Sequence, residues 1–488
     1  MMSRRATLRP NEGPFNAVED ASLNKAADGT IPPPPRRFKS HDSMAPPLEG
    51  ELAQAQSWAP PSFRLKCLDI ARGCTVALML FVNHAGNEPR WIAHAAWDGL
   101  HLADLVMPCF LLIVGVSIVL SLTAGRQRGT STNALLRRVL SRTGKLFALG
   151  LLIQGGAATG AFPMWDLARL RIFGVLQRIA VCFLLASLLV LYVPESRMPV
   201  VETVWERLIT KPEPAQAVVE HDESHSSYWL LTPFKTYAYW WSIAFAYFSG
   251  FFAFSMLIRP AGCKQWPALA PDCNMAAAAD AWFLGTSHMY PYPSCQRADP
   301  PCEYFDPEGL FSTLAGGVVS TFIGIWFGCV VLSLTSHSAR LKAWSTASIL
   351  LFELGVALHV TDTIPFNKGL YSASYVAVTA GTSGAFMAVL YLFTDILQHK
   401  AFQKLSTPFL WLGMNSITVY VGDEILEKAI PWMYWSRKDA HLLGFIEWVF
   451  HAALGDGWFC NLALALADVA FWMAIAGVLH RRQWYLKI

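Results

Sequence analysis

A histidine and an asparagine, eleven residues apart, are the side chains in this sequence best suited to chemistry. Asn83 lies near the end of an apolar stretch, and His94 follows it within the segment Trp91–Gly99. An imidazole can act as a base or as a nucleophile near neutral pH. A carboxamide can donate a hydrogen bond to an oxygen that gains negative charge. A histidine beside aromatic residues is also often structural, so this pair alone does not decide between the two interpretations.

Charged residues occur close to the same pair, at the ends of apolar stretches. Asp69 and Arg72 are three residues apart and therefore share one face of a helix. They form either a structural ion pair or a site for the phosphate of a cofactor. Asp104 begins the next apolar stretch, where a carboxylate can also cap the N-terminus of a helix.

Two arginines occur close together further along the chain. Arg171 and Arg178 are seven residues apart and flank Gly174. On a helix, this spacing puts both on one face, about 10 Å apart. Paired arginines can hold phosphate or carboxylate groups. The alternative is a pair of internal salt bridges, for example to Asp104.

A third polar group interrupts an apolar stretch near the end of the chain. Asn415 and Ser416 lie inside this stretch, and Asp423 and Glu424 lie at its far end. A polar group inside a membrane span is costly, so each is a candidate for function. The acidic side chains could orient a cationic or hydroxylated substrate, or they could be ordinary loop carboxylates.

Composition indicates which elements position these groups. The chain has 488 residues, of which 54% are hydrophobic and 15% are charged, whereas soluble domains carry roughly 25% charged residues. Apolar stretches of about 20 residues recur and are long enough to cross a bilayer as helices. They lack the alternation of barrel strands. We therefore expect an all-α fold, a polytopic bundle of transmembrane helices in a lipid bilayer. The net charge of +3 does not indicate a nucleic-acid partner.

Hydropathy predicts ten spans within residues 63–488, of which the third is short and Gly-rich. Residues 1–62 are polar and Pro-rich without the apolar core of a signal peptide, and we expect a disordered cytosolic tail. A docking site for a partner is the alternative for this tail. The expected spans are 67–84, 102–123, 145–160, 172–193, 237–258, 311–334, 346–361, 375–396, 407–424 and 459–479.

The distribution of basic residues predicts the orientation of the bundle. The loop after the second span contains six basic residues and no acidic one: Arg126, Arg128, Arg137, Arg138, Arg142 and Lys145. The positive-inside rule places this loop in the cytosol. Counting spans outward puts both termini on the same side and His94 on the opposite, lumenal side. Asn367 and Lys368 are expected on the lumenal side too.

The largest loop on the lumenal side, at about 259–310, contains four cysteines: Cys263, Cys273, Cys295 and Cys302. Such a cluster predicts two disulfides and hence an oxidising compartment. Three pairings are possible, and the sequence does not choose among them. A zinc site is the rival interpretation, but the spacings are not the short ones that zinc sites usually have.

Together, these segments resemble the heparan-α-glucosaminide N-acetyltransferase family of membrane transacetylases and its bacterial relatives. The Asp-x-x-Arg-Gly motif at Asp69–Gly73 also occurs in other acyltransferase families, whereas the spacing of Asn83 and His94, followed by Ala103–Pro108, is specific. The resemblance covers nearly everything after residue 63. The other matching segments are Arg171–Arg178, Asp280–Gly285 with His288 and Tyr290, Asp306–Leu310, Pro365–Tyr375 and Leu412–Glu427.

The resemblance implies an enzyme that takes acetyl-CoA from the cytosol and passes the acetyl group to the amine of a lumenal glucosamine. The active-site histidine of the family falls on His94, and its partner asparagine falls on Asn83. We assign the cofactor to Arg178, Arg171, Arg72, Asp104, Asn415 and Ser416, and the acceptor sugar to Asp98, Trp97, Asp423 and Glu424. No metal is expected.

Two mechanisms fit His94 in such an enzyme. It can accept the acetyl group and pass it on, or it can deprotonate the amine while both substrates are bound. We favour the general base, because a shared pocket needs no long-lived acetyl-imidazole. Asn83 would then donate a hydrogen bond to the carbonyl oxygen of the thioester.

The sequence departs from the family near the expected acceptor site. Asp98 stands where the family commonly has Asn, Asp423 stands where the animal enzymes have His, and Ala281–Trp282 replaces a pair that contains Arg. The identity of the acceptor is therefore the most open part of the assignment. We also expect no counterpart of the lumenal domain and extra first span of the animal enzymes.

Two other functions remain open from the sequence. One is a transporter of a sugar-like or acidic solute, and the other is an O-acetyltransferase of a glycan. We expect a lysosomal or vacuolar membrane, with the plasma membrane as the alternative, and a homodimer is possible.

Overall fold

The computed structural model describes residues 65–85, 89–154, 167–168, 170–193, 228–260, 263, 267–271, 273–289, 307, 309–428 and 442–486. All described residues belong to one compact unit, Arg64–Ile488. The expected Pro-rich tail at 1–62 lies outside the described residues, as do Cys295 and Cys302.

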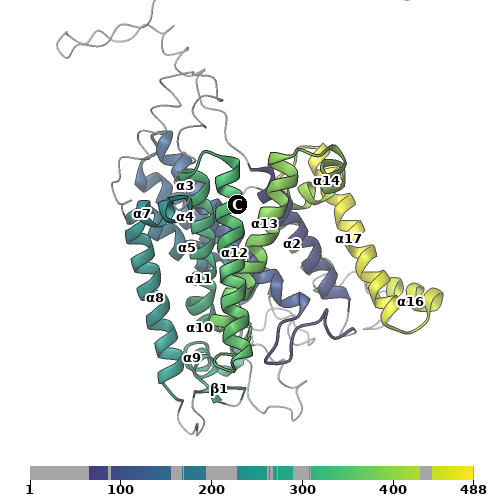
Figure 1. Ribbon diagram of the computed structural model, residues 1–488. Coiled ribbons are helices and arrows are strands. Elements are labelled where there is room, and N and C mark those ends of the chain that lie inside the picture. Colours follow the sequence, from purple (N-terminus) through teal and green to yellow (C-terminus); the bar gives the residue numbers. More distant parts are fainter. Residues whose placement is uncertain are drawn as a thin grey trace, which may run out of the picture. The chain divides into compact units, whose positions relative to one another are not determined.

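The described part of the chain is an all-α polytopic membrane bundle, as the hydropathy predicts. Eight of its helices are long and apolar enough to cross a membrane, and they pack side by side in Figure 1. They are α2 (Lys66–His84), η1 (Leu102–Leu105) continued by α3 (Val106–Gln127), α5 (Val175–Tyr192), α8 (Ala238–Leu257), α10 (Leu310–Ser312) continued by η5 (Thr313–Gly317) and α11 (Val318–Ser333), α12 (His337–Val360), α13 (Ala373–Tyr391) continued by η6 (Leu392–Ile396), and α17 (Trp458–Arg481).

Two of the ten expected spans take another form. Residues 145–154 of the span expected at 145–160 form the second half of a longer helix, α4 (Thr132–Gln154), whose first half holds Arg137, Arg138 and Arg142 of the expected basic loop. Residues 155–160 lie outside the described residues. The span expected at 407–424 is two helices, α14 (Lys400–Met414) and α15 (Ser416–Lys428). They are separated at Asn415, whose φ of −114° and ψ of 19° depart from helical values. A broken helix within a membrane bundle often marks a binding site.

Short elements gather at one end of the bundle. An antiparallel pair of two-residue strands, β1 (Leu269–Ala270) and β2 (Cys273–Asn274), precedes α9 (Met275–Leu284) and η3 (Thr286–His288). In Figure 1, β1 and α9 lie at the opposite end of the bundle from the C-terminus. This arrangement agrees with the predicted separation of the cysteine loop from the C-terminal end. Two other short helices are α7 (Tyr228–Thr236) and α16 (Leu442–Leu454).

A disulfide joins Cys263 to Cys273, with their Cα atoms 5.5 Å apart, within the ordinary range. One of the two expected disulfides is therefore present. The other two cysteines of the cluster, Cys295 and Cys302, lie outside the described residues.

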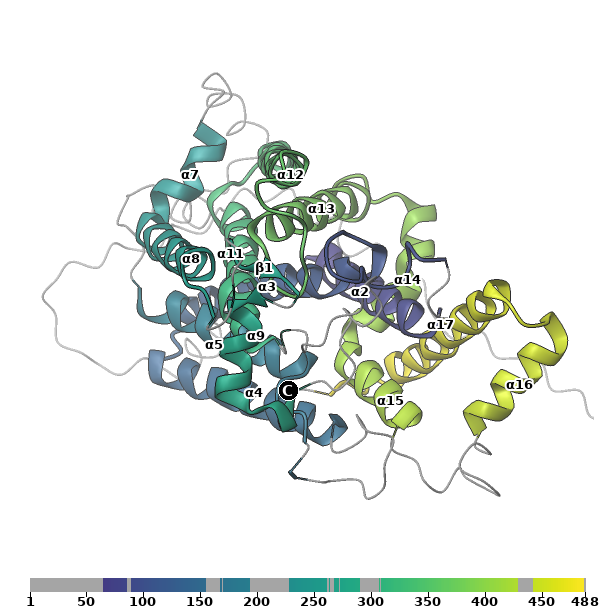
Figure 2. The same cartoon turned by 90° about the horizontal axis from the view of Figure 1, so that it is seen from below.

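Close contact between glycines fixes α2 against α14. A Cβ atom on Gly73 would overlap the backbone carbonyl of Phe409, and one on Gly413 would overlap that of Asp69. Small residues allow membrane helices to approach backbone to backbone. The crossing brings the first turns of α2, with Asp69 and Arg72, next to the break between α14 and α15. Viewed from below, α17 packs beside α2 and α14, and α16 lies outermost (Figure 2).

Candidate functional site

His94 and Asp104 form a hydrogen-bonded pair. Nδ1 of His94 lies 2.7 Å from Oδ1 of Asp104. The Asp104 side chain is fully buried, whereas 43% of the His94 side chain is exposed. Because an ionised carboxylate only accepts hydrogen bonds, Nδ1 must be the donor. Nε2 of a neutral His94 then holds the lone pair that a base or nucleophile needs.

Backbone groups of the surrounding loop hold the Asp104 carboxylate in place. Oδ2 accepts hydrogen bonds from the N–H groups of Ala95 at 3.2 Å and His101 at 3.0 Å. The second of these caps the start of η1, as the capping interpretation of Asp104 predicts. The hydroxyl of Tyr375, on α13, donates to the Asp104 carbonyl at 2.6 Å. The role of Asp104 in cofactor binding stays a prediction.

The loop that contains His94 is folded back on η1. N–H groups of Leu102 and Ala103 donate to the carbonyls of Trp91 and Ile92 at 3.0 and 3.1 Å. Ile92 is buried and packs with Ala465 of α17. These contacts give the His94 loop a defined position at the end of α2.

Lys368 is a member of the site that the sequence-based assignment omits. Its Nζ atom lies 2.9 Å from Nδ1 and 3.0 Å from Nε2 of His94, and 3.6 Å from Oδ1 of Asp104. The sequence places Lys368 on the same side as His94, but 274 residues separate the two. Only the tertiary structure brings them together.

Asp98 and Trp97, both expected at the acceptor, bind neighbouring loops. Oδ1 of Asp98 accepts a hydrogen bond from Nδ2 of Asn367 at 3.0 Å, and the indole N–H of Trp97 donates to the carbonyl of Leu269, in β1, at 3.0 Å. Partial burial raises the pKa of Asp98, while the hydrogen bond from Asn367 and the nearby His359 oppose that rise. Their role at an acceptor stays a prediction.

Asn83 lies in the last turn of α2 and is exposed. Within the described part of the chain, its side chain makes no hydrogen bond, and no contact joins it to His94. Its assignment as the partner of His94 is therefore still a prediction.

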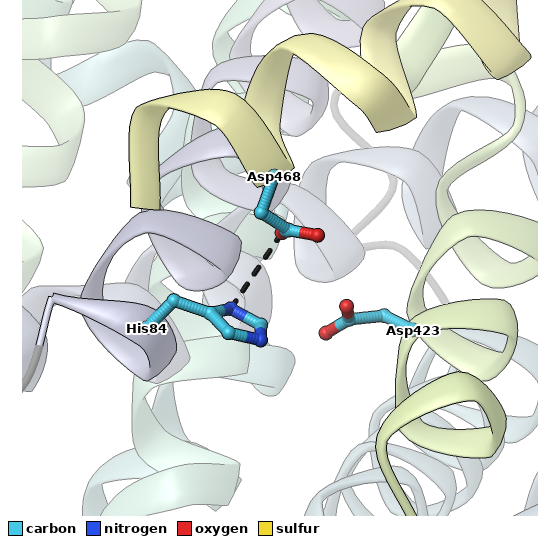
Figure 3. Close-up of side chains that lie close together, drawn as sticks. All are labelled: His84, Asp423 and Asp468. Carbon is cyan, nitrogen blue, oxygen red and sulfur yellow. Dashed lines mark ion pairs between the residues drawn. The ribbon is translucent and has the colours of Figure 1, made fainter. Parts of the chain in front are cut away.

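Asp423 lies in a cluster with His84 and Asp468, formed where α15, α2 and α17 meet (Figure 3). Nδ1 of His84 lies 3.6 Å from Oδ2 of Asp468 and 3.1 Å from the carbonyl of Leu80. The indole of Trp472 donates to Oδ1 of Asp423 at 3.1 Å. One nitrogen or oxygen atom from each member lies within 4.8 Å of the others, a set that could hold a metal ion.

This cluster is close to the His94 loop. Ala85 follows His84 directly and packs with Ile92 and Ala465 in one small apolar cluster. Asp423 is nearly fully buried and Glu424 is half-buried, so their expected role with the acceptor stays a prediction. The expectation that no metal is needed is likewise untested.

Arg72 lies at the break between α14 and α15. Its guanidinium contacts Asp69 at 3.3 Å, as the ion-pair interpretation predicts, and donates to the carbonyl of Gly413 and to Ser117, both at 3.4 Å. Asn415 is buried, and its Nδ2 donates to the Trp411 carbonyl at 3.2 Å. Oδ1 of Asn415 has no hydrogen-bond partner among the described residues. Ser416, the other residue expected at the cofactor, begins α15.

The expectation that Arg171 and Arg178 share one helix face is wrong. Helix α5 begins at Val175 because Gly174 is extended, with φ of −93° and ψ of −168°, so Arg171 precedes the helix. Arg178, in the first turn of α5, packs against the backbone of Gly309, where a Cβ atom would overlap its guanidinium. Arg171 therefore lies in the segment before α5 and Arg178 lies in α5 itself.

Asp280 fixes the turn against which Arg178 packs. Its two carboxylate oxygens accept hydrogen bonds from the N–H groups of Gly309 and Phe311, both at 2.8 Å. Gly309 has φ of +100°, a conformation that favours glycine. The matching segments around Asp280 and Gly309 thus meet in space beside Arg178.

Comparison with known proteins shows what the chain is similar to. Residues 64–256 match the catalytic region of heparan-alpha-glucosaminide N-acetyltransferase. The chain is 30% identical over 469 residues to heparan-alpha-glucosaminide N-acetyltransferase of Homo sapiens, an alignment that covers 91% of this chain and 63% of the relative. It is 29% identical over 462 residues to the Mus musculus enzyme of the same name, covering 91% and 64%. The chain thus spans a little under two thirds of the length of these relatives. These matches confirm the resemblance of the chain to the heparan-α-glucosaminide N-acetyltransferase family.

Proposed function

We propose that this protein is a membrane acetyltransferase that moves the acetyl group of cytosolic acetyl-CoA to the amine of a glucosamine-type sugar on the other side. The observation that supports it best is the pair of His94 and Asp104, 2.7 Å apart, in a loop at the same end of the bundle as β1. A histidine held by a buried carboxylate is suited to proton transfer during acyl transfer. We place the enzyme in a lysosomal or vacuolar membrane.

His94 acts as the general base in this proposal. Asp104 accepts a hydrogen bond from Nδ1, so Nε2 is the nitrogen that receives a proton from the acceptor amine. The amine nitrogen attacks the thioester carbonyl at the same time. The carbon–sulfur bond then breaks, the acetyl group stays on nitrogen, and the CoA thiolate leaves and takes up the proton. Asn83 donates a hydrogen bond to the carbonyl oxygen. Direct transfer of acetyl through Nε2 is the alternative that the same geometry allows.

The break between α14 and α15 suits the pantetheine part of acetyl-CoA. Oδ1 of Asn415 is a buried hydrogen-bond acceptor without a partner among the described residues. An amide N–H group of a pantetheine arm could donate a hydrogen bond to it. Arg72 supplies positive charge beside the break, and Arg178 supplies it on α5. Cationic side chains of this kind hold phosphate groups. Acetyl-CoA itself supplies the activated acetyl group.

The acceptor enters from the end that holds the His94 loop. Trp97 offers an indole face, which suits the apolar face of a sugar ring, and Asp98 offers a carboxylate for hydroxyl groups. Asp423 and Glu424 lie on α15, whose cluster with His84 adjoins the same loop. An anionic wall of this kind favours a cationic amino sugar.

Replacement of His94 by alanine tests the proposal. Purified protein in detergent is supplied with acetyl-CoA and glucosamine, and free CoA and N-acetylglucosamine are measured together. We expect the wild type to form both in equal amounts and His94→Ala to form neither. His451→Ala is the matched control. His451, in α16, is also a half-exposed histidine, and its Nδ1 lies 2.8 Å from Oδ1 of Asp456.

Three outcomes would contradict the proposal. Activity retained in His94→Ala would remove His94 from the chemistry. Movement of labelled sugar across proteoliposomes without consumption of thioester would indicate a transporter. Acetylation of N-acetylglucosamine in preference to glucosamine would indicate a hydroxyl acceptor and an O-acetyltransferase.

A further inference from the structure

The ammonium group of Lys368 lies against the ring of the proposed base. It is within 3.0 Å of both ring nitrogens of His94 and 3.6 Å from the carboxylate of Asp104. We propose that Lys368 is a positioning residue that keeps His94 uncharged and therefore able to accept a proton. This inference rests on the proposed function, in which His94 is the general base.

Electrostatic repulsion favours the uncharged ring in this position. The ammonium of Lys368 lies almost equally far from both ring nitrogens, so it does not point along the lone pair of Nε2 alone. Nδ1 donates to Asp104, and the lone pair of Nε2 stays available for the proton of the acceptor amine. If the ring were an imidazolium, the contact between the two cations would be repulsive. Two unit charges about 3 Å apart change an ionisation equilibrium by about tenfold even at the dielectric constant of water.

Lys368 also compensates the negative charge of Asp104, which would otherwise favour a protonated His94. Asp104 is a fully buried carboxylate, and a buried carboxylate beside a lone histidine favours the imidazolium. With Lys368 3.6 Å away, the negative charge of Asp104 already has a cation beside it. The group of three is then electrically neutral with His94 uncharged.

A rigid loop holds Lys368 at this place. The adjacent Asn367 is fully buried; its Nδ2 donates to Asp98 and its Oδ1 accepts from the N–H of Leu370 at 2.8 Å. Its own N–H donates to the hydroxyl of Ser372 at 3.1 Å. Tyr371 has φ of 51°, a conformation that non-glycine residues adopt only where their surroundings impose it. A loop fixed at so many points defines the position of Lys368.

Other titratable groups near His94 are engaged elsewhere. Asp98, in the same loop, is bound by Asn367. His101 contacts the carbonyl of Ala93 through Nδ1 at 3.0 Å, and His359 stacks on Phe366 with ring centroids 4.1 Å apart. Asp104 and Lys368 both contact the His94 ring, and they act on its protonation in opposite directions.

The consequence concerns catalysis at acid pH. A histidine with only Asp104 beside it would take up a proton in an acidic compartment and lose its function as a base. Lys368 extends the active range toward lower pH. It does so without touching the substrate, so its loss should change the pH profile more than the highest rate.

The experiment compares the pH dependence of kcat for acetyl transfer in the wild type, Lys368→Met and Lys368→Arg. Methionine keeps much of the length of the side chain without its charge, and arginine keeps the charge. We expect the acidic limb of the Lys368→Met profile to move to higher pH by about one unit, and that of Lys368→Arg to move by much less. Lys342→Met, which removes an exposed lysine from α12, should leave the profile unchanged.

A second measurement covers the case in which a variant is inactive. Diethyl pyrocarbonate modifies neutral imidazole, and mass spectrometry of the peptide that contains His94 gives the rate of modification at each pH. The midpoint of this rate should also move upward by about one pH unit in Lys368→Met. Lys368→Gln replaces Lys368→Met if the methionine variant does not fold.

The outcomes separate this inference from the proposed function. Equal acidic limbs and equal midpoints for wild type and Lys368→Met would overturn the role of Lys368, even if the rate fell. A shift of equal size for Lys368→Arg and Lys368→Met would show that the loss of positive charge is not the cause, and would also overturn it. Absence of acetyl transfer in the wild type would contradict the proposed function instead.

Discussion

Replacement of Asp104 by asparagine keeps the shape of the side chain and removes the charge that holds His94. In the structure, Oδ1 of Asp104 accepts from His94 and Oδ2 accepts from the N–H groups of Ala95 and His101. An asparagine has only one oxygen, so it cannot accept at both places. If its oxygen faces His94, its NH₂ group faces two N–H donors. If its NH₂ group faces His94, Nδ1 must become the acceptor and Nε2 loses its lone pair.

The orientation that the asparagine adopts determines the loss of activity, which the contacts allow us to estimate. A correctly oriented general base contributes about 10²–10⁴ in rate, and the second orientation removes it altogether. The first orientation leaves buried N–H groups without an acceptor, at a cost of about 1–3 kcal/mol each. The second orientation is therefore favoured, and we expect kcat of Asp104→Asn to fall by roughly 10² or more.

The assay measures the initial rate of CoA release from acetyl-CoA with glucosamine, at saturating concentrations of both. Thermal unfolding in the same detergent checks that the variant is folded. Asp456→Asn is the matched control, since Asp456 also contacts a histidine, His451, at 2.8 Å and has no part in the proposed site.

A folded Asp104→Asn variant with more than a tenth of the wild-type kcat would refute this reasoning. It would mean that the 2.7 Å contact between Asp104 and His94 does not determine which nitrogen of His94 accepts the proton of the amine. A loss of equal size in Asp456→Asn would point to a general disturbance of the protein instead.

Three further predictions concern groups outside this contact. Asn83→Ala should lower kcat by roughly 10² if its side chain stabilises the carbonyl oxygen, and a loss below tenfold in the same assay would leave it a structural residue. Arg178→Ala should raise KM for acetyl-CoA with a smaller effect on KM for glucosamine, and equal effects on both would contradict a cofactor role. Gly413→Ala should lower the midpoint of thermal unfolding because its Cβ would overlap the Asp69 carbonyl, whereas Gly250→Ala, which meets no neighbouring atom, should not.

Hydropathy predicts most of the helices because a membrane span must be apolar along its whole length. It is less informative where a span is interrupted. The stretch 407–424 contains enough apolar residues for one helix, but Asn415 divides it into α14 and α15. The close approach of α14 to α2 at Gly73 and Gly413 places this break beside Arg72, and that contact exists only in the tertiary structure. In α4, three basic residues of the expected loop, Arg137, Arg138 and Arg142, prove to be helical, since nothing in their charge prevents it.

The site is predictable from sequence where its members are close together in the chain. His94 and Asp104 are ten residues apart, and both are identified as candidates from the residues and the resemblance. Their direct contact is not predicted, because it requires the loop to fold back on η1. Lys368 comes from a loop 274 residues away from His94. A lysine in a polar loop is usually a solvated surface residue, so its type alone gives no reason to place it in the site.

The same three residues explain how a charged site can lie at the edge of an apolar bundle. A buried carboxylate such as Asp104 is costly unless hydrogen bonds and a nearby cation compensate it. Two backbone N–H groups and His94 provide the hydrogen bonds, and Lys368 provides the charge. If His94 supplied the cation instead, the fold would be stabilised by the protonated form, which cannot act as a base. Stability and catalysis therefore make opposite demands on His94, and a separate cation at position 368 allows both to be met.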